Sequence, residues 1–182
     1  MNLLRVAPYI AVSLPLVFFL SLTFIIVHNP WFSLQNNAFS DMGSLRNPTR
    51  WYFNGFLMGF AVLAFIPAYA AFRNGLSYLM PLALVFLFLV GVFPEELPYH
   101  APSAVLFYLL ALADIAIVGF RLGGRGLGLG YLWSAMSLVT LLSMLLIVKL
   151  RLFRGLAIPE LVGAVFILSW FVFLGGLLSG GF

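Results

Sequence analysis

The stretch PYIAVSLPLVFFLSLTFIIV, residues 8–27, decides the fold class, because it is a long apolar run without a charged side chain. An α-helix rises about 1.5 Å per residue, so about 20 such residues cross the ~30 Å hydrocarbon core of a bilayer. Arg5 gives the run a basic start, as in a secretory signal peptide. The run is longer than a signal-peptide core and no small-x-small cleavage site follows it, so we predict a retained transmembrane helix.

Five more apolar runs follow the first, and together they predict six membrane spans in a single domain, residues 1–182. In hydrocarbon, every backbone N–H and C=O group needs a partner inside the protein, and runs of this length suit helices rather than barrel strands. The sequence therefore predicts an all-α fold, a polytopic bundle of six transmembrane helices with short loops. The predicted spans are residues 8–27, 51–72, 78–93, 101–120, 130–148 and 158–178.

The composition supports this class and excludes several others. Hydrophobic residues make up 64% of the 182 residues and charged residues only 8%, and the mean hydropathy is +1.14. A chain with so little polar surface cannot face water on all sides. The net charge of +4 fits loop residues that meet lipid head groups, and we expect no nucleic-acid partner. With no cysteine, the chain has no disulfide, no thiolate nucleophile and no cysteine metal ligand.

Two glycines in the second span predict a packing contact. Gly55 and Gly59 stand four residues apart and so lie on the same side of a helix. Such small-x-x-x-small pairs let a neighbouring membrane helix approach closely. We assign this pair to helix packing.

The polar residues gather on one side of the membrane. Six crossings place the loops at residues 28–50, 94–100 and 149–157 on the same side, which we call face A, and both termini on the other. Lys and Arg are divided almost evenly between the faces, but Arg5 before the first helix favours cytoplasmic termini in the cell membrane. Face A receives both histidines and four of the five acids: His28, Asp41, Glu95, Glu96, His100 and Glu160.

Three motifs within face A carry a family resemblance. They are NAFSDMGS at residues 37–44, GVFPEELPYHAPSAVLFY at residues 91–108 and IPE at residues 158–160. With these motifs the chain resembles the prokaryotic membrane family catalogued as domain of unknown function 998, over nearly its whole length. The resemblance implies a six-helix membrane fold and no particular reaction. It carries the family's motif positions onto Ser40, Asp41, Gly43, Pro94, Glu95, His100 and Glu160.

One position departs from that pattern. The family's last motif has a basic residue after its glutamate, whereas this chain has Leu161 after Glu160. The departure counts against a charge pair at this place. A simpler role is also open to these acids, because Glu95, Glu96 and Glu160 each follow a proline in a predicted first helical turn, where the helix dipole stabilises a carboxylate.

The sharpest chemical hypothesis is a metal-assisted hydrolase that acts on a lipid or a membrane-embedded substrate. His28, His100 and Glu160 would hold a divalent metal such as zinc, and Glu95, Glu96 or Asp41 would act on the water. No fixed ligand spacing such as HExxH supports this set. Basic residues at face A would bind an anionic lipid head group, namely Arg46, Arg50, Arg151 and Arg154.

Two other functions compete with this hypothesis. Asp114 lies inside the fourth span, where an exposed charge costs about 2.5–3.5 kcal/mol. It either accepts hydrogen bonds, with Ser134, Ser137 and Thr140 as expected partners, or moves protons in an ion- or proton-coupled transporter. The third hypothesis is a non-catalytic accessory subunit or scaffold that packs against other membrane subunits.

A geometric expectation links the three hypotheses. We expect His100 and Glu160 to lie close together at face A, near Asp41. Adjacent residues in a helical turn point about 100° apart, so Glu95 and Glu96 should face different surroundings. Only one of these two glutamates should therefore reach the cluster.

Overall fold

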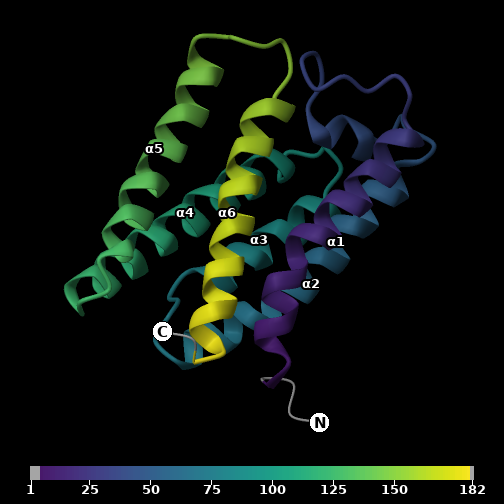
Figure 1. Ribbon diagram of the computed structural model, residues 1–182. Helices are drawn as coiled ribbons and strands as arrows, with labels where there is room; N and C mark the ends of the chain where they lie inside the picture. Colours follow the sequence, from purple (N-terminus) through teal and green to yellow (C-terminus); the bar gives the residue numbers. More distant parts are fainter. Residues whose placement is uncertain (1–4, 181–182) are drawn as a thin grey trace.

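The computed structural model describes residues 5–180, and over this range all regular secondary structure is helical, which confirms the all-α prediction. The chain forms six α-helices and one short 3₁₀-helix, η2, in the first loop (Figure 1). Their bounds are α1 Ala7–Val27, η2 Phe39–Gly43, α2 Arg50–Arg73, α3 Met80–Val92, α4 His100–Gly124, α5 Leu129–Lys149 and α6 Ala157–Leu178.

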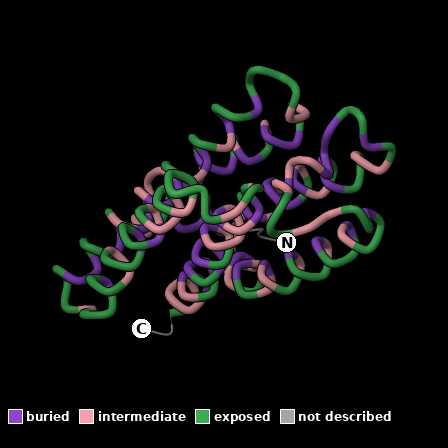
Figure 2. Tube along the Cα trace, turned by 90° about the horizontal axis from the view of Figure 1, so that it is seen from above, coloured by how far each residue is buried: buried purple, intermediate pink, exposed green. Residues whose placement is uncertain are grey.

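Five of the helices, α1, α2, α4, α5 and α6, are long and apolar enough to cross a membrane. The helix α3 has 13 residues, which corresponds to a rise of about 20 Å. Large apolar side chains such as Leu138, Val139 and Leu142 lie exposed on the outside of the bundle. Figure 2 shows buried residues where helices face one another and exposed residues along their outer sides. The chain therefore has the architecture of a multi-pass membrane protein.

Both ends of the described chain lie at the same end of the bundle (Figure 1). At the opposite end, backbone hydrogen bonds join loops that are distant in sequence. The N–H groups of Arg154 and Gly155 donate to the Gln35 carbonyl at 3.0 and 3.1 Å, and that of Ala157 donates to the Asn37 carbonyl at 2.9 Å. The first loop and the α5–α6 link thus form one layer at face A.

Close helix contacts occur at glycines other than the predicted pair. A Cβ atom on Gly119 of α4 would lie 2.7 Å from the carbonyl oxygen of Gly130 on α5, so these two backbones touch. A Cβ atom on Gly55 or Gly59 would meet no atom within 4 Å. The prediction that Gly55 and Gly59 form a packing contact within the chain is wrong, because this side of α2 faces outward.

The helix α5 lies at the edge of the bundle against α4 and α6 (Figure 1). Its buried residues are Gly130, Ser137 and Thr140. Ser134 and Ser137 of α5 donate to the backbone carbonyls of Ala116 and Leu112 on α4, both at 2.6 Å. Small and hydroxyl-bearing residues thus fasten α5 to α4.

Asp114 of α4 binds the start of α3 rather than the serines of α5. Its Oδ1 accepts hydrogen bonds from the N–H groups of Tyr78 and Leu79 at 2.5 and 2.6 Å, and its Oδ2 accepts one from the Ser77 hydroxyl at 2.9 Å. The first N–H groups of a helix lack partners within that helix and attract a carboxylate. Asp114 is fully buried and supplies these acceptors. The expected partners Ser134 and Ser137 are therefore wrong, whereas the expected hydrogen-bonded role is supported.

Candidate functional site

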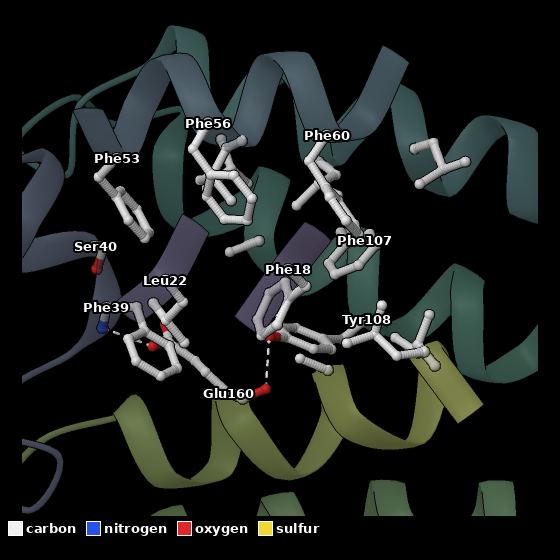
Figure 3. Close-up of a pocket in the computed structure, with 18 of the residues that line it drawn as sticks. Phe18, Leu22, Phe39, Ser40, Phe53, Phe56, Phe60, Phe107, Tyr108 and Glu160 are labelled. Carbon is white, nitrogen blue, oxygen red and sulfur yellow. Dashed lines mark hydrogen bonds between the residues drawn. The ribbon is translucent and has the colours of Figure 1, made fainter. Parts of the chain in front are cut away.

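An apolar cavity of about 90 Å³ lies inside the bundle, between α1, α2, α3, α4 and α6. Figure 3 shows the aromatic rings that surround it. At the end nearest face A, the apolar lining gives way to Ser40, His100, Tyr108 and Glu160. Seven phenylalanines contribute to the wall: Phe18, Phe39, Phe53, Phe56, Phe60, Phe107 and Phe171.

Glu160, in the first turn of α6, fastens the 3₁₀-helix η2 to the bundle. Its Oε2 accepts a hydrogen bond from the Phe39 N–H at 2.8 Å, and its backbone carbonyl accepts one from the Tyr108 hydroxyl at 2.9 Å (Figure 3). No side chain caps the start of α6 itself. Glu160 stands in the first turn of α6, as expected, and its side chain stabilises the start of η2. Glu95 and Glu96 lie in the loop before α4, so the expectation that they stand in a first helical turn is wrong.

Asp41 lies in η2 and is held by the residues just before it. Its Oδ2 accepts hydrogen bonds from the Asn37 side-chain amide at 2.9 Å and from the Ala38 N–H at 3.1 Å. These bonds fix the orientation of the carboxylate. Asp41 and Glu95 both lie close enough to Glu160 for their charges to act on it.

Glu95 forms a carboxyl pair with Asp41. Its carboxyl group lies beside the Asp41 carboxyl group and the Ser40 hydroxyl and interacts with both. Burial, the interaction with the Asp41 carboxyl group, and the negative charges of Asp41 and Glu96 raise the pKa of Glu95 from its ordinary value of 4.5 to about 7. Two carboxyl groups this close together do not both ionise readily, so below a pH of about 7 the pair carries a shared proton.

The neighbouring Glu96 has different partners. It accepts hydrogen bonds from the Ser44 hydroxyl and from the Leu45 N–H, the latter at 3.0 Å. The Ser44 hydrogen bond, with the Leu45 N–H, lowers the pKa of Glu96 below its ordinary value. The two glutamates thus diverge as expected, and Glu96 ties the first loop to the α3–α4 loop instead of joining the carboxyl pair.

His100 begins α4 and lines the cavity. Its Nδ1 lies 2.6 Å from the Phe93 carbonyl oxygen. A carbonyl oxygen only accepts, so Nδ1 carries the proton of this hydrogen bond. In the neutral ring, Nε2 is then an acceptor. His100 and Glu160 line the same cavity, and each supplies a hydrogen-bond acceptor.

The carboxyl pair also borders an open hollow on the outer side of face A. This hollow has a volume of about 320 Å³, and Asp41, Glu95 and Arg46 are among its lining residues. Ser40, which interacts with Glu95, lines the inner cavity instead. The pair therefore borders the outer hollow, and Ser40 connects it to the apolar cavity.

His28 is not part of this arrangement. It follows α1 and is exposed; its Nδ1 bonds to the Phe24 carbonyl at 2.8 Å, and its ring packs on Phe24 and Tyr52. Over residues 5–180, no three His, Cys, Asp or Glu residues come together in a group that could hold a metal ion. The expected ligands His28, His100 and Glu160 thus do not assemble, because the end of α1 holds the His28 ring on its own flank.

The four basic residues expected at a head-group site all lie outside the cavity. Arg46 lines the outer hollow. The guanidinium group of Arg50 stacks over the Trp51 ring at 5.0 Å. Arg151 and Arg154 line a separate hollow at the α5–α6 link. An anion bound at Arg50, Arg151 or Arg154 would therefore sit outside the hollow that the carboxyl pair borders, whereas Arg46 shares that hollow with the pair.

The sequence analysis missed the aromatic cavity and the buried amide network beside it. Phe53, Phe56 and Phe60 follow helical spacing on α2, which is the one signal that could have indicated a shared aromatic face. The fully buried Asn29 accepts hydrogen bonds from the Asn47 amide at 2.8 Å and from the Thr49 hydroxyl at 2.9 Å. This network closes the base of the first loop and so positions η2.

Comparison with known proteins agrees with the resemblance in the motifs. A search of curated proteins and a search of solved structures each gave no match. The model of one family, described as protein of unknown function (DUF998), matches residues 12–176, which include η2, the α3–α4 loop and the first turn of α6. This match covers most of the chain, including Asp41, Glu95 and Glu160, and the chain therefore belongs to the DUF998 family.

Proposed function

We propose that this protein is a membrane hydrolase that acts by acid–base catalysis on a lipid or another membrane-embedded substrate. One observation carries the proposal: the Asp41–Glu95 pair borders an open hollow, and Ser40 beside it lines an apolar cavity inside the bundle. A hydrolase of this kind needs water on one side of its acid–base groups and the apolar part of the substrate on the other. The two cavities offer these two environments.

The carboxyl pair supplies the two groups that hydrolysis requires, a general base and a general acid. One ionised carboxylate takes a proton from a water molecule as the water oxygen bonds to the electrophilic carbon of the substrate. The protonated partner gives its proton to the leaving oxygen or nitrogen as that bond breaks. A general acid or base works best with a pKa near the working pH, and the pKa of about 7 at Glu95 meets this condition. Ser40 and His100 would position the reacting group.

This acid–base form replaces the metal-assisted form of the hypothesis for a geometric reason. The metal-assisted form needs His28 beside His100 and Glu160, and these three residues form no ligand group within the described chain. The acid–base form needs only the Asp41–Glu95 pair for proton transfer, and Ser40 interacts with this pair.

In the proposed topology the chain crosses the membrane six times and face A lies outside the cell. The short helix α3 would complete its crossing with the residues next to it, within the predicted span 78–93. Arg5, ahead of α1, supports cytoplasmic termini. The carboxyl pair would then meet substrates in the outer leaflet.

Proton-coupled transport is the second candidate, and the same carboxyl pair favours it. A group with a pKa of about 7 that borders the outer hollow can load and release protons near neutral pH. The distinguishing measurement is proton flux into liposomes that contain the purified protein. A flux that Glu95→Gln abolishes, without any hydrolytic product, would favour transport over hydrolysis.

The test of hydrolysis uses a lipid extract and water labelled with heavy oxygen. The purified full-length protein, reconstituted with a bacterial lipid extract, should release products that carry the heavy oxygen, as mass spectrometry would show. Glu95→Gln and Asp41→Asn should each lower this incorporation by roughly 10²–10⁴-fold, the usual contribution of a general acid or base.

The matched control is Glu96→Gln, which changes the adjacent carboxylate outside the pair. This variant should keep most of the activity once its stability has been checked. Equal loss in Glu96→Gln and Glu95→Gln, both folded, would contradict the proposal. So would incorporation that neither pair variant reduces.

A further inference from the structure

The polar end of the cavity contains hydrogen-bond acceptors and acids but no cation. Glu160 and His100 line it, Asp41 and Glu95 lie close enough for their charges to act on Glu160, and no Arg or Lys is among its described lining residues. Positive charge at face A sits elsewhere, with Arg46 in the outer hollow. The polar end of the cavity therefore favours groups that donate hydrogen bonds.

We infer that this cavity takes a single class of ligand: an amphiphile whose head group donates hydrogen bonds and carries no negative charge, such as an alcohol or an amine. Its hydrocarbon tail lies among the phenylalanine rings, and its head group lies at Glu160 and His100. This inference rests on the proposed function and narrows its substrate.

The acceptors at the polar end leave room for a donor. The Oε2 atom of Glu160 already accepts from the Phe39 N–H, but a carboxylate has two oxygens and about four acceptor positions. The Nδ1 atom of His100 is occupied by the Phe93 carbonyl, which leaves Nε2 as an acceptor in the neutral ring. A hydroxyl or amino head group can satisfy both acceptors, and an ammonium group also gains from the nearby carboxylates.

An anionic head group is disfavoured at the polar end of the cavity. It would leave water for a site that already holds Glu160 and the Asp41–Glu95 pair, with no cation to offset either desolvation or repulsion. Phosphate groups of ordinary anionic lipids are therefore rejected at this end. The arginines at Arg151 and Arg154 line a different hollow and do not change this balance.

The cavity of about 90 Å³ holds the carbons nearest the head group, and the rest of a longer tail extends beyond it. Phe18 of α1 packs against Phe56 and Phe60 of α2, each with its ring centroid 5.8 Å away. Ala104 of α4 and Ala164 of α6 lie between such rings and leave the space open. A larger side chain at either alanine would occupy the place of the tail.

The experiment compares three amphiphiles with the same tail: dodecanol, dodecylamine and dodecyl phosphate. The full-length protein is placed in phosphatidylcholine nanodiscs at neutral pH, and the amount of each amphiphile retained is measured against empty nanodiscs. The filling variant Ala104→Phe identifies binding in the cavity. Its control is Val105→Phe, because Val105 is the next residue of α4 and is 56% exposed on the outside of the bundle.

We expect dodecanol and dodecylamine to show excess retention with an affinity at least roughly tenfold above that of dodecyl phosphate, a difference of about 1.4 kcal/mol. Ala104→Phe should remove this excess and Val105→Phe should keep it. If Ala104→Phe does not fold, Ala164→Leu fills the same cavity from α6. Dodecyl phosphate bound equally well, with the same sensitivity to the filling variants, would overturn the head-group inference and leave the proposed function standing. If the filling variants change the retention of none of the three amphiphiles, both the head-group inference and the proposed function are overturned.

Discussion

The carboxyl groups of Glu95 and Asp41 lie beside each other and interact, although α2 and α3 separate them in the chain. Each belongs to a loop that the other loop helps to hold, since Glu96, next to Glu95, accepts hydrogen bonds from Ser44 and Leu45. Glu160 fastens the same region to α6 through the Phe39 N–H. The pair therefore forms where the first loop, the α3–α4 loop and the start of α6 meet at face A.

Removal of the Asp114 carboxylate should destabilise the bundle according to how many acceptors remain. Asp114→Leu strands the N–H groups of Tyr78 and Leu79 and should lower the free energy of unfolding by about 1–3 kcal/mol per lost partner. Asp114→Asn keeps one acceptor oxygen and should lose less. Thermal unfolding of the purified variants in one detergent checks the order, and equal loss in both would contradict the account. Loss of a proton flux in a folded Asp114→Asn variant would instead assign the residue to proton movement.

Two glycine substitutions should change stability in opposite directions. Gly119→Ala places a methyl group 2.7 Å from the Gly130 carbonyl oxygen, so α4 and α5 must separate, at a cost of about 1–3 kcal/mol. Gly59→Ala meets open space and should stabilise α2 by about 0.5–1 kcal/mol through helix propensity. Thermal unfolding measures both. A stabilised Gly119→Ala would show that α4 and α5 are not in close contact.

The protein should lose stability as pH rises between 4.5 and 7, over the range in which Glu95 titrates. Its pKa is higher in the folded state, so the folded state binds more protons there than the unfolded state, and stability falls as pH rises. Glu95→Gln should flatten this part of the profile and stabilise the protein above pH 7. The check is the unfolding temperature as a function of pH for both proteins. An unchanged slope in Glu95→Gln would show that another group is responsible.

The proposed six crossings can be tested with single cysteines, since the chain has none of its own. Asn36→Cys and Leu97→Cys, both at exposed positions of face A, should react with an impermeant thiol reagent from the same side of the membrane. Asn74→Cys and Arg125→Cys should react from the other side. If the first two substitutions react from opposite sides, α3 does not cross the membrane and the topology is wrong.

The helices could be predicted because hydrophobic length is a local property of the sequence. The expected span at residues 78–93 corresponds to α3, Met80–Val92, and the other spans match their helices similarly. The convergence of Asp41, Glu95 and Glu160 also followed from the sequence, because alternating crossings sort the loops by side.

The contacts that define the site could not be predicted in the same way. Nothing near Asp114 indicates that the α2–α3 loop donates to it, because this depends on the depth at which α3 begins. The phenylalanines of the cavity look like lipid-facing residues until the helix rotations are known. The ring of His28 could have turned towards His100, but the Phe24 carbonyl one helical turn away holds it. These features depend on tertiary packing, which spacing alone does not determine.

The shared proton of Asp41 and Glu95 is the central claim, and infrared spectroscopy of the full-length protein tests it most directly. A protonated carboxyl group absorbs at a C=O stretching frequency that an ionised one lacks, so the band reports protonation as pH is varied. We predict that part of this band disappears at a pH of about 7 in the native protein and that this part is missing at neutral pH from both Glu95→Gln and Asp41→Asn, while Glu96→Gln keeps it. A native band with no part that titrates at about 7, or a band in Glu95→Gln equal to the native one, would contradict the shared proton and the acid–base mechanism built on it.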